Sequence, residues 1–402
     1  MAGHSDDEVA RKAGVPVDRI GVMRDLGFLT AADGEHADSD VQRARIADAF
    51  DRGGLSLEAL GRLIRKGAYS MNWVDAIYPN PVPMSGVTFA ELMDELGMPL
   101  EFARRGFAIG YQLPLPSDED ELREDEAELL RISAMVFHMM EGDPEAAMAS
   151  ARPFGDNVRR LAEGQMSWFR THVEERMLAE GRSVHDVMEI TSEMSSQMLS
   201  VADRALVLMY RRQLERYGIE DSVLNTELAL AEAGEAAAPG PRSLTMAFVD
   251  LSGYTSLTQA QGDEAAADAT ARLADQAYEM TARSGGNIVK LAGDGVMLRF
   301  AEPIEGLACC LELVGSSKAT DLPSMHAGVA FGPVVQRTGD CFGNTVNLAA
   351  RISARAEPGE VLVSEPLKDA TVASAFEWDD LGSVKLKGVK EPVRLFRAWL
   401  TP

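Results

Sequence analysis

Asp250 and Asp294 are the two residues of this sequence that most directly suggest chemistry. Asp250 ends the apolar run LTMAFVD, residues 244–250, and Asp294 lies between two glycines in KLAGDGVMLRF. If the two segments are neighbouring strands, both carboxylates project from one end of a sheet and repel each other unless a cation lies between them. Oxygen-only ligation favours Mg²⁺ or Mn²⁺ over zinc. Aspartates are also common turn formers, and that alternative stays open.

Two further groups of residues could act on a phosphorylated substrate. Gly253, Tyr254 and Thr255 follow Asp250 closely, and their backbone could face phosphates. Asn347 and Arg351 are four residues apart in GDCFGNTVNLAARI, which begins in a glycine-rich turn and continues as a helix, so they share one helical face. An amide and a guanidinium on one face could orient a sugar and stabilise charge on phosphorus. An exposed arginine beside a capping asparagine is the alternative.

A lysine-rich turn, VKLKGVKEP at 384–392, lies near the end of the chain. Its lysines are Lys385, Lys387 and Lys390. Solvated surface lysines are the ordinary interpretation, whereas a triphosphate would use one of them.

These residues fall in a region where short strands alternate with helices. The predicted strands are 244–250, 287–293, 295–300, 325–332, 360–364 and 393–400, and the predicted helices are about 262–284, 303–318 and 343–356. This order predicts one domain, over 243–402, with a mixed sheet and helices covering one face. The segment before it, AEAGEAAAPGPRS, is small and Gly/Pro-bearing, which predicts a linker over 231–242.

The upstream region, residues 1–230, is predicted to be helical. Apolar residues at helical spacing predict helices in 121–140 and in 185–218, the latter as one long helix or two. Many methionines lie here, and we expect them to pack a core, with a lipid-like ligand as the minor alternative. They include Met135, Met139, Met140, Met188, Met194 and Met198.

Charge and composition exclude several classes of function. The net charge is −24, and even residues 1–70, whose helical order resembles MerR-type helix-turn-helix regulators, hold 10 basic and 12 acidic side chains. Nucleic acid is therefore not expected as a partner. The sequence shows no membrane-length apolar run and no secretion signal. Three cysteines argue against a disulfide framework. We therefore expect a cytoplasmic protein.

Four separated motifs resemble the catalytic domain of class III nucleotidyl cyclases. They are AFVDLSGYTSLT, VKLAGDGVMLRF, GDCFGNTVNLAARISA and VKLKGVKEPVRLFRA, in this order over about residues 243–400. The resemblance implies an α+β fold, with a ferredoxin-like βαββαβ catalytic domain at the C-terminus. It also implies a homodimer whose active sites are built across the interface.

The resemblance implies specific roles for the residues at the matching positions. Asp250 and Asp294 match the two metal-binding aspartates, with the Leu251 carbonyl as a further ligand of Mg²⁺ or Mn²⁺. Lys290 and Asp340 match the pair that reads the purine. In addition, Asn347 and Arg351 match the transition-state pair, and Lys387 is the candidate for the triphosphate lysine.

The purine-reading pair favours ATP. Adenine presents an acceptor at N1 and a donor at its amino group, which complement the Lys290 ammonium and the Asp340 carboxylate, whereas guanine presents the reverse. The implied reaction is in-line attack of the ribose 3′-hydroxyl on the α-phosphorus with two metal ions, giving cyclic AMP and pyrophosphate. The alternatives are a guanylyl cyclase and a non-catalytic cyclase fold used for sensing or dimerisation.

The helical region resembles the regulatory domain of acid-responsive soluble bacterial adenylyl cyclases, which inhibits at neutral pH. The histidines His4, His36, His138, His172 and His185 lie in this region, five of the six in the chain. Because histidine titrates near physiological pH, the resemblance implies an autoinhibitory, pH-sensing domain. The alternative is that these histidines lie at the surface or are hydrogen-bonded within the core.

Overall fold

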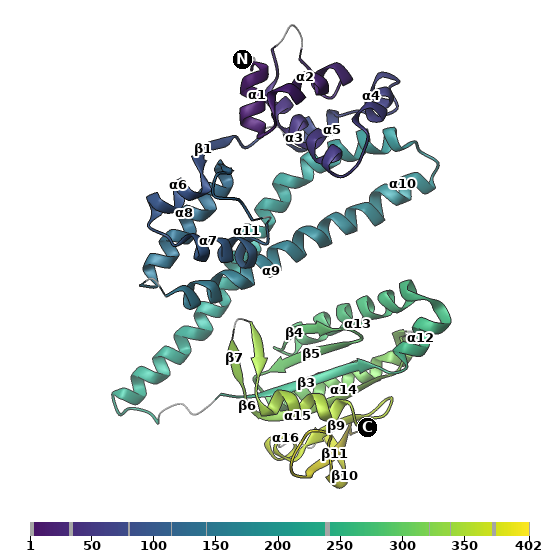
Figure 1. Ribbon diagram of the computed structural model, residues 1–402. Helices are drawn as coiled ribbons and strands as arrows, with labels where there is room; N and C mark the ends of the chain where they lie inside the picture. The colour runs from purple at the N-terminus through teal and green to yellow at the C-terminus, as the bar shows by residue number, and fades with distance from the viewer. Residues whose placement is uncertain are drawn as a thin grey trace. The chain divides into compact units, whose positions relative to one another are not determined.

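The computed structural model describes residues 4–31, 35–78, 81–113, 115–141, 143–237, 242–320, 322–337, 339–371 and 375–401 (Figure 1). The chain divides into two compact units, an N-terminal unit of Met1–Ile219 and a C-terminal unit of Glu220–Pro402. The predicted boundaries at 230 and 243 stay a prediction, and residues 238–241 of the predicted linker lie outside the described residues.

The N-terminal unit begins with a cluster of five short helices around its own apolar core. Ser5 caps the first helix with a capping box, and Gly14 ends it in the left-handed conformation. Ile20, Met23 and Phe28 are fully buried at the centre of this cluster. The helices are α1 (Asp6–Ala13), α2 (Val17–Leu26), α3 (Asp38–Arg52), α4 (Leu57–Arg65) and α5 (Asn72–Ile77).

A second helical core follows, and it includes a short ribbon that the sequence did not indicate. Strands β1 (Met84–Thr88) and β2 (Glu121–Arg123) pair antiparallel in this otherwise mainly helical region. The helices around the core are α6 (Phe89–Leu96), α7 (Leu100–Gly106) with the π-helical turn η1 (Phe107–Tyr111), and α8 (Glu124–Met139).

Long helices complete this region. They are α9 (Pro144–Phe169), continued by η2 (Arg170–Glu174) and α10 (Glu175–Ala179), and then α11 (Val184–Glu232). The segment predicted as one helix or two is thus a single helix of 49 residues (Figure 1). Among the described residues, no helix combines the length and apolar character needed to cross a membrane.

The expectation that the methionines of this region pack a core is wrong for four of them. Met135, Met139, Met140 and Met198 are 41–69 % exposed, because they lie on outward faces of α8 and α11 or just beyond the end of α8. Helical spacing places residues on a face but does not decide which face is covered.

The C-terminal unit is built on a seven-stranded sheet in the order β10-β11-β9-β6-β3-β5-β4. Its four-strand part, β6-β3-β5-β4, is antiparallel and has helices after β3 and after β5, which is the ferredoxin-like βαββαβ arrangement. The fold class predicted for this domain is confirmed. The strands are β3 (Ser243–Leu251), β4 (Asn287–Ala292), β5 (Gly295–Phe300), β6 (Met325–Pro333), β9 (Val361–Ser364), β10 (Phe376–Val384) and β11 (Val393–Leu400).

Helices cover both faces of this sheet, not one face as expected. Alternation along β3 sends Ala247 and Val249 into the core beneath α13 and α14, while Met246 faces the core beneath α15. The helices are α12 (Tyr254–Gln261), α13 (Asp263–Arg283), α14 (Pro303–Thr320), α15 (Asn344–Ser353) and α16 (Glu365–Ala370). The sheet therefore presents the end of β3 beside α15.

Three strands of this unit were not expected from the sequence. β10 carries acidic and glycine residues in FEWDDLGSV, which obscure its alternation. A hairpin of β7 (Val335–Arg337) and β8 (Asp340–Phe342) occupies the stretch predicted as a glycine-rich turn before α15.

Gly328 lets α15 lie close against β6. A Cβ at this position would lie 1.9 Å from the Ser353 backbone nitrogen and 2.5 Å from the Ala349 oxygen. We predict that Gly328→Ala destabilises the protein by about 1–3 kcal/mol, because backbone cannot move aside as a side chain can. Thermal unfolding measures this change.

Gly315→Ala is the matched control. Gly315 lies exposed in α14 with open space around it, so the same substitution should be neutral or stabilising by up to about 1 kcal/mol. Equal unfolding temperatures for wild type and Gly328→Ala would contradict the close packing of α15.

Candidate active site

The register of the sheet brings Asp250 and Asp294 to the same end. Asp250 pairs with Gly295 across β3 and β5, and the Leu251 N–H donates to the Asp294 carbonyl oxygen at 3.0 Å. Asp294 itself lies in the two-residue turn between β4 and β5. Both aspartates are partly buried. The pairing of β3 with β5 places the two residues next to each other at one end of the sheet.

The Asp250 side chain lies between a hydroxyl and a glycine. Its Oδ2 accepts a hydrogen bond of 2.6 Å from the Ser353 hydroxyl. On the other side, a Cβ at residue 295 would lie 1.9 Å from Asp250 Oδ1, so only glycine leaves room for the carboxylate. The hydrogen bond therefore directs the acid, and the glycine gives it space.

His326 stands next to Asp250 on the opposite neighbour, β6. The two residues are directly paired across the antiparallel strands, so their side chains leave the sheet on the same face. The His326 Nδ1 lies 2.9 Å from the Ser252 hydroxyl. Serine and histidine therefore flank the acidic end of β3 on the side away from Asp294.

Lys290 and Asp340 form a second pair. The Lys290 Nζ on β4 lies 2.7 Å from Asp340 Oδ2 on β8, and their side chains are 48 % and 30 % exposed. Asp340 Oδ1 also accepts from the Cys341 N–H at 2.8 Å, which orients the carboxylate. Burial raises the pKa of the Cys341 thiol, so this side chain stays neutral beside the pair. A donor and an acceptor thus lie side by side, open to solvent.

Helix α15 carries the other predicted pair. Asn347 and Arg351 are both exposed on it, while Val346, Ala349 and Ile352 face the core. The amide and the guanidinium therefore share the outward face, as their spacing predicted.

The remaining predicted residues border the site or lie in a separate turn. Gly253 has a φ of 74°, which favours glycine, and begins α12; Tyr254 packs against the core, and Thr255 is exposed. Leu251 is buried in the same core. Lys387 is exposed in the turn between β10 and β11. Their binding roles stay predictions.

The donor set suits a hard divalent cation that completes its coordination with water and substrate. Two aspartates and a nearby backbone carbonyl offer only oxygen, and Gly295 leaves Asp250 the space it needs. Among the described residues, no cluster of three or more His, Cys, Asp or Glu side chains forms a closed metal site.

Comparisons with known proteins agree with this geometry. Residues 238–398 match the adenylate and guanylate cyclase catalytic domain. The chain is 31 % identical over 322 residues to the pH-sensitive adenylate cyclase MT1302 of Mycobacterium tuberculosis, covering 77 % of each protein. The chain belongs to the class III adenylate and guanylate cyclase family. The predicted family is thereby confirmed.

Two further similarities were found. An adenylate cyclase of Glutamicibacter nicotianae is 29 % identical over 282 residues, covering 68 % of each protein. The solved structure of the adenylyl cyclase CyaB from P. aeruginosa matches 40 % of this chain and 96 % of its own, at 21 % identity and a TM-score of 0.37.

Three residues of the cyclase site were missed by reasoning from the sequence. Ser353 and His326 lie 103 and 76 positions from Asp250, so no local spacing could connect them with it. Gly295 offered a signal, since a glycine directly after an aspartate in a tight turn often marks a close approach of another group.

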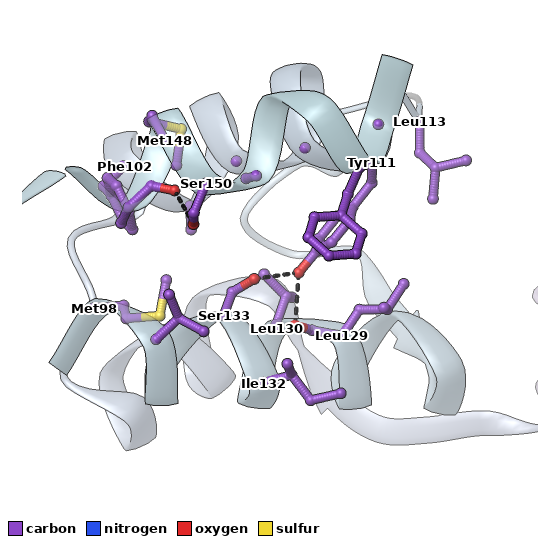
Figure 2. A pocket seen from close by; sticks show the side chains of 18 of the residues that line it. Met98, Phe102, Tyr111, Leu113, Leu129, Leu130, Ile132, Ser133, Met148 and Ser150 are labelled. Carbon is purple, nitrogen blue, oxygen red and sulfur yellow. Dashed lines mark hydrogen bonds between the residues drawn. The ribbon is translucent and has the colours of Figure 1, made fainter. Parts of the chain in front are cut away.

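The cyclase also has a separate apolar cavity of about 560 Å³ within the N-terminal unit (Figure 2). Side chains such as Met98, Phe102 and Met148 line it, and its hydroxyl groups are already bonded within the protein. Tyr111 donates to the Leu129 carbonyl oxygen at 2.6 Å, and burial raises the pKa of Tyr111, so the phenol stays neutral. The cavity therefore offers apolar contacts and no charge.

Proposed function

We propose that this cyclase converts ATP to 3′,5′-cyclic AMP and pyrophosphate. The observation that carries the proposal is the ion pair of Lys290 and Asp340, which sets a donor beside an acceptor at an exposed position. Adenine offers the complementary edge, and guanine would leave both groups mispaired. The relatives named as adenylate cyclases support the same substrate.

The other site residues would bind the metal ions and the triphosphate. Asp250 and Asp294 would hold Mg²⁺ or Mn²⁺, which when bound supply positive charge to the triphosphate and the ribose hydroxyl. The start of α12 after Gly253 offers backbone N–H groups to phosphate oxygens, with Tyr254 and Thr255 as its first residues. Lys387 would contact the triphosphate.

The Asn347 and Arg351 side chains would act at the reacting phosphate. The amide orients the ribose, and the guanidinium stabilises negative charge on the α-phosphate while the 3′-oxygen attacks and pyrophosphate leaves. Because one chain carries all six catalytic and base-reading positions, a homodimer would contain two equivalent sites, each shared between the subunits. Activity should therefore fall when the protein is diluted to the monomer.

The direct test is the cyclic product itself. The full chain is incubated with ATP or GTP and with Mg²⁺ or Mn²⁺, and we expect cyclic AMP in preference to cyclic GMP. Asp250→Ala should lower the rate roughly 10²-fold, because charge stabilisation in the site is lost.

Asp268→Ala is the control, since Asp268 is exposed on α13 away from these residues. Cyclic GMP as the main product would replace the proposal by a guanylyl cyclase. No cyclic product from either nucleotide, with a folded dimer, would favour the non-catalytic alternative.

We further propose that the N-terminal unit inhibits at neutral pH and responds to acid through His36. This side chain is fully buried, with Nε2 2.7 Å from Asp6 and Nδ1 3.2 Å from Asp40. Ionised carboxylates only accept hydrogen bonds, so both ring nitrogens of this imidazole face acceptors. The hydrogen bond from His36 is the main cause that lowers the pKa of Asp6.

Other charged and polar groups bond the members of this cluster or lie beside it. Arg24 on α2 bonds Asp6, and Thr30 donates to Asp40 through its N–H and its hydroxyl. His4, which forms a β-bridge with His36, lies 2.6 Å from Asp38 and 3.3 Å from the Lys12 Nζ. His138 and His172 contact the Leu96 and Trp168 carbonyl oxygens, and each also lies against an aromatic ring. Among the described residues, the two histidines of the bridge are the ones that lie within hydrogen-bond distance of carboxylates.

The sign of the effect can be worked out for Asp6. Because its pKa is lowered in the folded unit, the stabilisation from the ionised Asp6 carboxylate is present above about pH 3.8 and is lost as the pH falls below that value. Between pH 5.5 and 8 Asp6 therefore stays ionised and offers the buried imidazole an acceptor over the whole range.

We predict that His36→Asn flattens the dependence of cyclase activity on pH between 5.5 and 8, measured on the full chain. His172→Asn is the control, because His172 is exposed and should leave the profile unchanged. If both variants keep the wild-type ratio of activities at pH 5.5 and 8, the cluster does not regulate the enzyme.

The apolar cavity of the N-terminal unit supports a lipid-like ligand as a further regulator. Its volume and uncharged lining suit a long aliphatic chain (Figure 2). Ile132 lines the cavity and is 49 % exposed. We predict saturable binding of a fluorescent long-chain fatty acid, weakened roughly 10-fold or more by Ile132→Glu, because a carboxylate in apolar surroundings is costly.

Leu178→Glu places the same change on an exposed residue of α10 outside the cavity lining and should leave binding unchanged. Equal weakening by both variants would show that the probe binds the surface generally.

A further inference from the structure

Ser353 is a buried serine whose hydroxyl reaches across the fold to the Asp250 carboxylate. It lies at the end of α15, is 1 % exposed, and donates to Asp250 Oδ2 at 2.6 Å. Hydroxyls inside helices commonly bond back to a carbonyl of their own helix. Ser317 and Thr281 do so in this chain, with Val314 and Ala277. Ser353 instead bonds a charged group on β3.

The position of this hydroxyl is fixed by packing. Gly328 on β6 lies directly under the end of α15, so close that a Cβ there would meet the Ser353 nitrogen at 1.9 Å. The neighbouring Ile352 is fully buried in the same core. The end of the helix therefore lies directly against β6, and this close packing sets where the Ser353 backbone stands.

We propose that Ser353 is a positioning residue for Asp250 and links the metal-binding end of β3 to the helix that carries Asn347 and Arg351. This inference rests on the proposed function. The hydroxyl occupies one lone pair of Oδ2 and leaves Oδ1 and the remaining lone pairs directed away from α15. A divalent cation would then bind a carboxylate that is already oriented, and α15 would stay at a fixed distance from that carboxylate.

Partners that orient a metal-binding carboxylate typically change metal affinity 10- to 100-fold when removed. We expect an effect at the lower end of this range for Ser353, because its hydroxyl supplies a single neutral hydrogen bond to the carboxylate. Loss of the hydroxyl would leave the acid free to rotate, and more Mn²⁺ would be needed to fill the site.

The experiment measures binding, so that it does not depend on turnover. The full chain is titrated with 3′-deoxy-ATP, which lacks the attacking hydroxyl, at increasing Mn²⁺, and the Mn²⁺ concentration for half-maximal nucleotide binding is determined by calorimetry. We expect Ser353→Ala to raise this concentration roughly 10-fold. Ser353→Thr, which restores the hydroxyl, should return it towards the wild-type value.

Ser364→Ala is the matched control. Ser364 is also a fully buried serine of the C-terminal unit, but its hydroxyl has no hydrogen-bond partner among the described residues. Its removal should leave the Mn²⁺ requirement unchanged. If Ser353→Ala does not fold, Ser353→Cys replaces it, because the thiol has nearly the same shape and is a weak donor.

The outcomes separate this inference from the proposed function. An unchanged or lower Mn²⁺ requirement in folded Ser353→Ala, together with a large increase in Asp250→Ala, would overturn the role of Ser353 and leave the metal site intact. An unchanged requirement in Asp250→Ala would overturn the metal site itself. A rise shared equally by Ser353→Ala and Ser364→Ala would assign the effect to stability, and the positioning role would fall.

Discussion

The antiparallel register of β3 against β5 is the constraint on which the site depends. It sets Asp250 opposite Gly295 and bonds Leu251 to the Asp294 carbonyl oxygen. A slip of one residue would turn Asp250 to the other face of the sheet, into the core beneath α13 and α14. The apolar residues Ala247, Val249 and Leu251 prevent this slip, because they must remain in that core.

A second constraint is the contact between α15 and the sheet. Gly328 has no side chain, so the helix lies against β6 and reaches Asp250 through Ser353. The same helix presents Asn347 and Arg351 on its outward face. The acidic end of β3 and the polar face of α15 are thus parts of one rigid assembly within the C-terminal unit, which suits a reaction that depends on fixed charges.

The N-terminal unit uses charge in a different way. In the C-terminal unit, Asp250 accepts a hydrogen bond from the Ser353 hydroxyl, which is a neutral donor. In the N-terminal unit, Asp6 and Asp40 are bonded to a buried histidine, and Asp6 also to Arg24. The first arrangement suits binding of metal and nucleotide, whereas the second ties two carboxylates to one buried side chain.

The sequence by itself determined the order of six strands of the main sheet and of the helices α13, α14 and α15, because apolar alternation and glycine turns are local signals. It also determined that Asn347 and Arg351 share a face, since a spacing of four fixes this in any helix. The Lys290–Asp340 pair came from resemblance to a family, and the structure confirms that the two side chains meet.

Other features were decided only by the tertiary structure. The contacts of Asp250 with Ser353 and of His36 with Asp6 join residues 103 and 30 positions apart, and nothing local in the sequence relates them. Likewise, the sequence did not show that α15 covers the second face of the sheet, or that Met135 and Met139 are exposed. Periodicity states which residues share a face, whereas only the packing of distant segments decides what that face touches.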